Sequence, residues 1–248
     1  SFWTLTCCGL LLGNGGIMLR EHLKYQKVSD SYRRIQKTAL ARESTASGST
    51  GEAEESGPPV DFDALRAINP DVAGWLECEG AGISYPVVQG EDNTKYLTTL
   101  FDGGKGKAGC LFIDFENSPG LADQNTVIYG HNLLDGSMLS GIVQYKNQGY
   151  YDTYPTMRLY TPEDSYTVEL FAGYATPPTN HALAPDSPWA LGWEETAGVE
   201  AWLEQAQARS VFDSEVKVTP GDRVLTLSTC TNGGKDRFVL HGKLIADS

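Results

Sequence analysis

Between Val60 and the C-terminus, the sequence contains eight short runs of β-strand type, each bounded by Gly, Pro, Asn or Asp. The runs are GWLECE, ISYPVVQ, GCLFIDF, NTVIYGH, MRLYT, YTVELFAGYA, RVLTLST and RFVLHGKLI. Closely spaced runs with few helical segments between them are typical of all-β domains. This region is therefore expected to be mainly β, as a largely antiparallel barrel or sandwich.

Three segments of the same region have a helical pattern. A short helix is expected in DFDALRAINP, where an Asp can cap the first turn and Pro70 ends the helix. A second is expected at 137–145 and a third at 194–210. In the third, four apolar residues recur at helical spacing: Val199, Trp202, Leu203 and Ala206. We expect these helices to lie at the periphery of the β structure.

The N-terminal segment 1–19 carries no charge. As a helix it would span roughly 28 Å at about 1.5 Å per residue, close to the thickness of a bilayer's hydrocarbon core. No small-residue cleavage pattern of the signal-peptide type follows it. This segment is therefore predicted to be a membrane anchor.

Two further segments separate this anchor from the β-rich region. Residues 20–42 contain seven bases and two acids, strong helix formers and no Gly or Pro, which predicts a basic helical stalk. Residues 43–59 are rich in Ser, Gly and Glu, with few apolar side chains, and are expected to form a flexible linker. The remaining residues, 60–248, are expected to form one domain that folds without the preceding segments.

Charge and cysteine content limit the possible functions. The net charge of −13 disfavours nucleic acid as a partner, because phosphate binding needs a basic face. Five cysteines are too few for a disulfide scaffold, and Cys78, Cys110 and Cys230 are the three in the β-rich region. At least one thiol is therefore expected to be free, either as buried filler or as a reactive group.

The last two strand-like runs place two reactive residue types together. RVLTLSTC ends at Cys230, RFVLHGKL begins at Arg237, and the short segment TNGGKD joins them. A connection of this length and composition is typical of a β-hairpin, so these two residues should lie opposite each other at the rim of the sheet. A cation favours the thiolate, and a guanidinium can hold the oxyanion formed in acyl transfer.

Acyl transfer also needs a proton shuttle, for which the sequence has four histidines. His22 lies in the stalk, His181 lies in an irregular Pro-rich stretch, and His241 lies four residues inside the last strand. His131 ends the run NTVIYGH and can reach the rim of the sheet, so by position it is the best acid or base. Each of these residues also has a structural interpretation, as a packed thiol, a solvated arginine or a hydrogen-bonded histidine.

Other thiol and metal chemistry fits the sequence less well. Papain-like proteases have Cys early and His late in the chain, whereas here His131 precedes Cys230. The caspase Q-A-C signature is absent, and no Cys/His spacing is typical of a zinc site. No metal ligands are therefore predicted.

The sequence resembles the sortases, which are cysteine transpeptidases of Gram-positive cell surfaces. TLSTC at 226–230 resembles the sortase TLxTC motif, and RFVLHGKL resembles the Arg-bearing strand that follows it. YPVVQGEDNTKYL, KAGCLFIDFEN and IYGHNLLDGSML are similar to class B members in particular. The resemblance covers about 70–248.

This resemblance implies a role for each candidate residue. Cys230 would be the nucleophile, His131 the general acid and base, and Arg237 the ligand of the substrate and oxyanion. It also implies an eight-stranded β-barrel with a helix between the sixth and seventh strands, where 194–210 falls. No metal or other cofactor is implied.

The implied reaction is transfer of a protein to the cell wall. Cys230 would cleave a C-terminal sorting signal after Thr, forming a thioester that a peptidoglycan amino group then attacks. The implied signal is of the Asn-Pro-x-Thr type, and the implied location is the extracellular face of a Gram-positive cell membrane. Two alternatives remain open: a sortase that polymerises pilins onto a Lys amine, and a non-enzymatic anchored β-domain adhesin.

Substrate contacts are predicted near the same rim. We assign them to four residues: Ser228, Thr229, Tyr174 and Asn132. The segment TPPTNHALAPDSPW supplies four prolines and Trp189, which would form a semi-rigid apolar wall. Substrate choice is therefore predicted to lie in the 174–210 connection and in the wall after His131.

Overall fold

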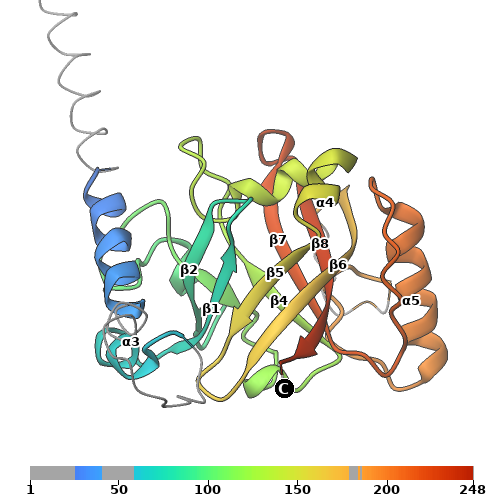
Figure 1. Ribbon diagram of the computed structural model, residues 1–248, viewed down its shortest axis with the longest axis horizontal. Helices are drawn as coiled ribbons and strands as arrows, with labels where there is room; N and C mark the ends of the chain where they lie inside the picture. The colour runs from blue at the N-terminus through green and yellow to red at the C-terminus, as the bar shows by residue number, and fades with distance from the viewer. Residues whose placement is uncertain (1–25, 41–58, 179–183, 185, 248) are drawn as a thin grey trace, which may run out of the picture.

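The computed structural model describes residues 26–40, 59–178, 184 and 186–247, and within them eight strands form a closed barrel (Figure 1). The strands are β1 Val72–Cys78, β2 Ile83–Gln89, β3 Leu111–Ile113, β4 Asn125–Tyr129, β5 Thr156–Tyr160, β6 Ser165–Thr176, β7 Val224–Thr231 and β8 Asp236–Ala246. Each overlaps one of the eight predicted runs. The expectation of a mainly β fold with an eight-stranded barrel is confirmed.

The strand order around the barrel is β1-β2-β3-β4-β7-β8-β6-β5. Six neighbouring pairs are antiparallel, whereas β2 with β3 and β4 with β7 are parallel. Because β4 and β7 run in the same direction, they end at the same end of the barrel, where β8 begins. This topology gathers the candidate residues that follow β4, end β7 and begin β8.

The helices largely match the sequence prediction. Helix α3 (Phe62–Ile68) is capped by the Asp61 carboxylate, which accepts from the backbone N of Ala64 at 3.0 Å. The predicted helix at 137–145 is a 3₁₀ helix, η3 (Ser140–Lys146), followed by α4 (Gln148–Thr153). Helix α5 (Thr196–Arg209) lies within the predicted 194–210. Three further short 3₁₀ helices are η1 (Lys95–Leu97), η2 (Pro119–Leu121) and η4 (Asn232–Gly234).

The two faces of the sheet bury different clusters of side chains. Leu225 and Leu227 of β7 belong to the main cluster of the barrel. The alternate residue Val224 belongs to a second cluster, which α5 covers with the four predicted apolar residues of its sequence pattern. The face of β7 that carries Val224 and Thr226 is therefore buried as well.

The N-terminal helix, formed by residues 26–39, packs directly against the barrel (Figure 1). Tyr32, Ile35 and Ala39 belong to the main cluster of the barrel, and Val28 packs against it. These residues form one stripe along the helix, which the basic character of the segment concealed. This part of the expected stalk therefore belongs to the folded unit.

Some sequence predictions fall outside the described residues. They include the anchor at 1–19, nearly all of the linker at 43–59, and His181. Within the residues that the structure describes, no helix combines the length and apolar character needed to cross a membrane. The same residues contain no cluster of three or more His, Cys, Asp or Glu side chains placed to hold a metal ion.

Candidate active site

Cys230 and Arg237 face each other across β7 and β8, as the hairpin predicted. The strands continue to Thr231 and Asp236, so the connection between them is shorter than the expected six residues. The turn needs positive φ at Asn232, Gly233 and Gly234, which explains its Asn and Gly content. The Arg237 guanidinium donates from Nη1 to the carbonyl oxygens of Gly234, at 3.3 Å, and Asp236, at 3.2 Å. The turn therefore holds this cation at the rim, next to the half-buried Cys230.

His131 follows β4, and its two neighbours in the chain are both bonded to β7. The hydroxyl of Thr229 donates to the Gly130 carbonyl oxygen at 2.7 Å, and the Asn132 side chain donates to the Cys230 carbonyl oxygen at 2.8 Å. The backbone of His131 is thus fixed beside the end of the strand that carries Cys230. The structure brings the three predicted catalytic residues to one end of the barrel.

A backbone carbonyl orients the imidazole of His131. Its Nε2 lies 2.8 Å from the carbonyl oxygen of Leu97, at the end of η1. Because a carbonyl oxygen only accepts, Nε2 must carry a proton, which leaves Nδ1 as the basic nitrogen of the neutral ring. The sequence could not reveal this contact, because a backbone carbonyl has no residue signature.

Gly130 is required at its position by close packing. A Cβ atom there would lie 2.5 Å from Leu111 Cδ2 and 2.6 Å from Leu139 Cγ. Both neighbours are buried, so a larger residue would displace the segment that carries His131.

The predicted substrate contacts divide into one exposed and three buried side chains. Asn132 lies at the exposed rim, whereas Ser228, Thr229 and Tyr174 are 2–3% exposed. The Ser228 hydroxyl accepts from Trp189 Nε1 at 3.0 Å. The buried three therefore lie beneath the rim, where they support the groups that a substrate would meet.

A chain of buried hydrogen bonds runs beneath Cys230 on the α5 side. Thr226 donates to Asn125 Oδ1 at 2.7 Å, so it accepts from His241 Nδ1 at 2.8 Å. Nε2 of the neutral His241 must then accept from the Tyr174 hydroxyl, at 3.2 Å. At the other end, the Asn125 side chain donates to the carbonyl oxygen of Ala190 at 2.7 Å. We name this chain the buried relay.

Burial keeps the imidazole of the buried relay neutral. His241 is fully buried, with its ring stacked on Phe171 at a centroid distance of 5.9 Å. Desolvation, reinforced by the positive charge of Arg209, lowers the pKa of His241 to about 3. His241 is therefore a structural group in this chain, in agreement with its predicted position away from the rim.

The connection between β6 and β7 is held to the sheet by these bonds and one other, and α5, which is part of that connection, is bonded to the 186–193 segment. Trp202 Nε1 donates to the Ser187 carbonyl oxygen at 2.8 Å, and the backbone N of Asn125 donates to the Leu191 carbonyl oxygen at 3.0 Å. Trp189, predicted to form an apolar wall, is buried against this face. Segment 186–193 thus forms a fixed wall on the α5 side of the site.

A second guanidinium, that of Arg209, lies near the site, and no sequence pattern indicated it. Arg209, at the end of α5, lies 4.3 Å from the ring centroid of Tyr174 and donates to Thr176 Oγ1 at 2.9 Å. Thr176 pairs with Arg237 across β6 and β8. The last turn of α5 is thereby joined to the same rim as Cys230.

The other two described thiols are placed for packing. Cys110 is buried, and burial raises the pKa of its thiol to about 12. Cys78 is also buried, with its sulfur 3.6 Å from the Tyr145 hydroxyl. Among the described cysteines, only Cys230 is partly exposed, as a nucleophile requires.

Comparison with known proteins agrees with this geometry. Residues 76–245 match the family model of the sortase domain. Sortase B of Listeria monocytogenes is 32% identical over 248 residues, covering 98% of this chain and 95% of that protein. Sortase B of Staphylococcus aureus is 30% identical over 187 residues, covering 74% of each.

Solved structures show the same relationship. The Staphylococcus aureus sortase B–substrate complex superposes with a TM-score of 0.79 and 27% identity, covering 91% of this chain and 100% of that one. Sortase B of Clostridium perfringens gives a TM-score of 0.68 and 32% identity, covering 75% and 100%. The chain therefore belongs to the sortase family of transpeptidases. Within that family its relatives place it in class B, so the alternative of a non-enzymatic adhesin is set aside.

Proposed function

We propose that this chain cleaves a C-terminal sorting signal after Thr and transfers the protein to a peptidoglycan amino group. The observation that carries the proposal is the register pair of Cys230 and Arg237, with the His131 segment bonded to the same strand. The Staphylococcus aureus relative was solved with its substrate, which supports a peptide as the partner on the acyl side.

In the first half of the reaction, Cys230 Sγ attacks the carbonyl carbon of the Thr residue. The Arg237 guanidinium, held by its turn, donates to the oxyanion of the tetrahedral intermediate. When the C–N bond breaks, His131 protonates the leaving amine. The product is a thioester between Cys230 and the Thr carboxyl group, together with the released C-terminal peptide.

In the second half, an amine attacks the thioester carbonyl carbon. His131 now accepts the proton of the attacking amine, and Arg237 again stabilises the oxyanion. The C–S bond breaks, the Cys230 thiolate is restored and a new amide bond forms. The proton that His131 gave to the leaving amine is thus replaced by one from the incoming amine.

The polar residues at and beneath the rim act by positioning. Thr229 and Asn132 hold the His131 segment to β7, whereas Ser228 holds Trp189 and Tyr174 ends the buried relay. We infer that the wall at 186–193 selects the peptide and that the preferred signal is of the Asn-Pro-x-Thr type. Replacing 176–192 with the equivalent connection of another sortase should change which peptide is cleaved, while Cys230 stays reactive. Unchanged peptide preference would place selectivity elsewhere.

The proposed location is the outer face of a Gram-positive cell membrane, with residues 1–19 as the anchor. The support is the uncharged sequence of that segment and its length as a helix. Fractionation of cells that express the full chain or a chain lacking 1–19 tests this directly. Recovery of both forms in the soluble fraction would refute the anchor.

The decisive experiment for the reaction is the capture of the acyl-enzyme. A library of peptides with Thr at the scissile position is incubated with the chain, and the protein is then analysed by mass spectrometry. The expected result is a thioester on Cys230 from peptides of one pattern, which disappears when an amine such as triglycine is added. The proposal fails if no peptide gives this adduct.

A further inference from the structure

The N-terminal helix begins at the end of the barrel that carries the candidate active site, here called the rim end (Figure 1). Val28, in its first turn, lines a groove of about 740 Å³ together with Leu133 of the loop after His131. At the other end of the helix, the carbonyl oxygen of Ala39 accepts from the backbone N of Asp61 at 2.9 Å, just before α3. The helix therefore runs from the rim end to the opposite end, the far end, where β4 and β7 begin.

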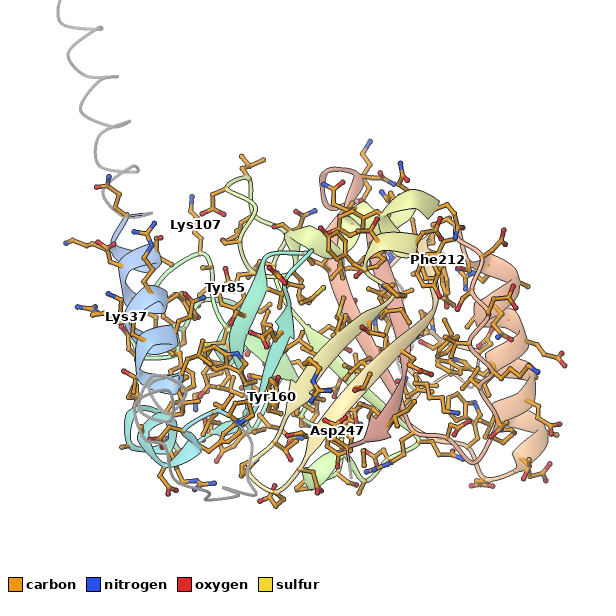
Figure 2. The ribbon with its side chains drawn as sticks, in the orientation of Figure 1. Lys37, Tyr85, Lys107, Tyr160, Phe212 and Asp247 are labelled. Atoms are coloured by element: carbon orange, nitrogen blue, oxygen red, sulfur yellow. The ribbon has the colours of Figure 1, made fainter. Side chains whose placement is uncertain are left out.

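The two ends of the barrel differ in charge. At the far end, three connections carry acids and no base: 90–94, 114–124 and 161–164. The rim end carries both signs, with Lys107, Lys146 and Lys235 among its bases. Figure 2 labels Lys107 toward the rim end and Asp247, which follows β8, at the far end. A phosphate-rich lipid surface would therefore repel the far end more strongly than the rim end.

The predicted anchor restricts which end can approach a bilayer. Residues 20–25 are all that separates the anchor at 1–19 from the helix that begins at residue 26. At about 3.3–3.6 Å per residue when fully extended, this link spans at most about 25 Å. The helix carries the chain roughly 20 Å farther, at about 1.5 Å per residue, before it reaches the far end. The rim end is thus the end that the anchor holds near the membrane.

Leu134 stands out at the rim end. Its exposure is 105%, the highest among the large apolar residues that the structure describes. The turn that carries it is fixed, because the backbone N of Leu133 donates to the Ser140 hydroxyl at 2.7 Å and that of Gly136 donates to the Leu133 carbonyl oxygen at 3.1 Å. A single exposed Leu is common on protein surfaces. This one, however, is presented by a rigid turn at the end held near the membrane, where an apolar side chain can enter the lipid head-group region.

We propose that the rim end docks on the membrane at its helix side, with the Leu134 side chain inserted into the lipid surface. The partner is a phospholipid bilayer, and the acidic far end points away from it. This inference rests on the proposed function through the anchor at 1–19. In this orientation, Cys230 and His131 lie close to the lipid surface, so chains that are themselves attached to the membrane reach them directly.

The test measures the depth of labelled positions in the full chain. Leu134→Cys, Lys37→Cys and Glu163→Cys are each made in a chain that also carries Cys7→Ala, Cys8→Ala and Cys230→Ala. The remaining thiols, Cys78 and Cys110, are buried. Each variant receives an environment-sensitive fluorophore and is reconstituted into phospholipid vesicles whose lipids carry nitroxide quenchers near the head groups.

The three positions distinguish the possible orientations. Glu163 is exposed in the β5–β6 turn at the far end, and Lys37 is exposed in the second half of the helix, where Figure 2 labels it. The label at 134 should lose most of its emission, whereas the labels at 37 and 163 should keep nearly all of theirs. Interfacial insertion reaches only about 5–10 Å, and Lys37 lies roughly 15 Å along the helix from its start.

Three results would overturn the proposal. Equal quenching at 37 and 134 would mean that the molecule lies on its side, and stronger quenching at 163 would mean that it is inverted. Absence of quenching at 134, in chains that float with the vesicles, would mean that the turn does not touch lipid.

Two controls separate this inference from the rest of the proposed function. If the chains do not float with the vesicles, the anchor fails, and this inference fails with it. If the wild type gives no acyl-enzyme but quenching at 134 is observed, the reaction fails while the orientation stands. The sorting peptide is the other candidate partner of Leu134, so it is added to the labelled chain in detergent without lipid. Emission at 134 should stay unchanged, and a change would assign Leu134 to the peptide and overturn the membrane contact.

Discussion

The two helices on opposite sides of the barrel are attached in different ways (Figure 1). The N-terminal helix adds Tyr32, Ile35 and Ala39 to the main cluster of the barrel. Helix α5 instead covers a separate cluster, beside a connection that buried hydrogen bonds fix to the sheet. Hydrogen bonds are directional and allow one register, whereas apolar contacts tolerate small shifts.

This difference bears on the proposed selection of the sorting peptide, which is assigned to the α5 side. On the α5 side, hydrogen bonds fix the wall at 186–193, which suits recognition of one peptide pattern. The N-terminal helix instead borders an open groove that is lined by both acids and bases. The predictions below test this contrast, from the largest expected effect to the smallest.

The first prediction compares the thiol of Cys230 with that of Cys110, which lies beside Tyr32 of the N-terminal helix. Cys230→Ala should abolish acylation and leave the fold intact, because it removes the nucleophile from a half-buried strand end. Cys110→Ala should keep activity and lower only the stability, since Cys110 is buried beside Tyr32. Alkylation with a methanethiosulfonate, followed by peptide mapping, should modify Cys230 and spare the buried Cys78 and Cys110 in the folded chain. Rapid modification of Cys110 would show that the contrast is wrong.

The second prediction contrasts two guanidinium groups on the α5 side. Arg237→Lys should lower kcat for acylation by about 100-fold to 1000-fold, because an ammonium cannot reproduce the guanidinium fork at the oxyanion. Arg209→Lys should have a much smaller effect, because Arg209 is joined to Tyr174 and Thr176.

The measurement for both is steady-state kinetics on one labelled peptide. His131→Asn, which removes the proton shuttle, should be at least as damaging as Arg237→Lys. Near-full activity in the Arg237 variant would mean that this residue acts only as a point charge.

The third prediction concerns stability. Ile35→Ala on the N-terminal helix and Leu203→Ala on α5 both remove a buried side chain, and each should cost about 2–5 kcal/mol of unfolding free energy. Only the α5 variant should also raise KM for the sorting peptide, because it loosens the wall at 186–193. Denaturant titration and kinetics on the same samples separate the two effects. Similar KM changes in both variants would show that the wall at 186–193 does not select the sorting peptide.

The same packing changes an expectation drawn from the sequence. A chain that begins at residue 60 was expected to fold without the preceding segments. Because the helix contributes to the main cluster, we now expect that truncation to retain acylation but to unfold at a lower temperature.

The fourth prediction uses acid. The pKa of His241 is about 3 in the folded chain and about 6.5 when unfolded, so the unfolded state binds more protons between these values. Its contribution to stability is complete above about pH 6.5 and is lost as the pH falls toward 3. Between pH 6.5 and pH 5 this amounts to about 2 kcal/mol.

The control for this prediction is His241→Gln, which cannot titrate and should flatten the pH dependence in this window. Hydrogen exchange at pH 5 should show α5 and the 186–193 wall opening before the N-terminal helix. If α5 and the N-terminal helix opened together, protonation of His241 would not destabilise the α5 side selectively.

Local patterns in the sequence predicted most of the fold. Alternating and turn residues identified all eight strands, and the hairpin connection placed Cys230 opposite Arg237. The packing of the N-terminal helix was missed because its apolar stripe lies among bases, and its partners are distant in the chain. The Leu97 carbonyl and the Ala190 carbonyl, which orient His131 and end the buried relay, are backbone groups that no residue pattern reveals.

The parallel pairing of β4 with β7 has a consequence for when the enzyme becomes active. The bonds that fix the His131 segment beside Cys230 join residues 98 and 99 positions apart in the sequence. Contacts of such long range form late, because a large loop must close before they contribute. An unfolded chain thus lacks the bonds that hold His131 beside the strand of Cys230. Closure of the barrel is therefore the step that brings the proposed catalytic residues together.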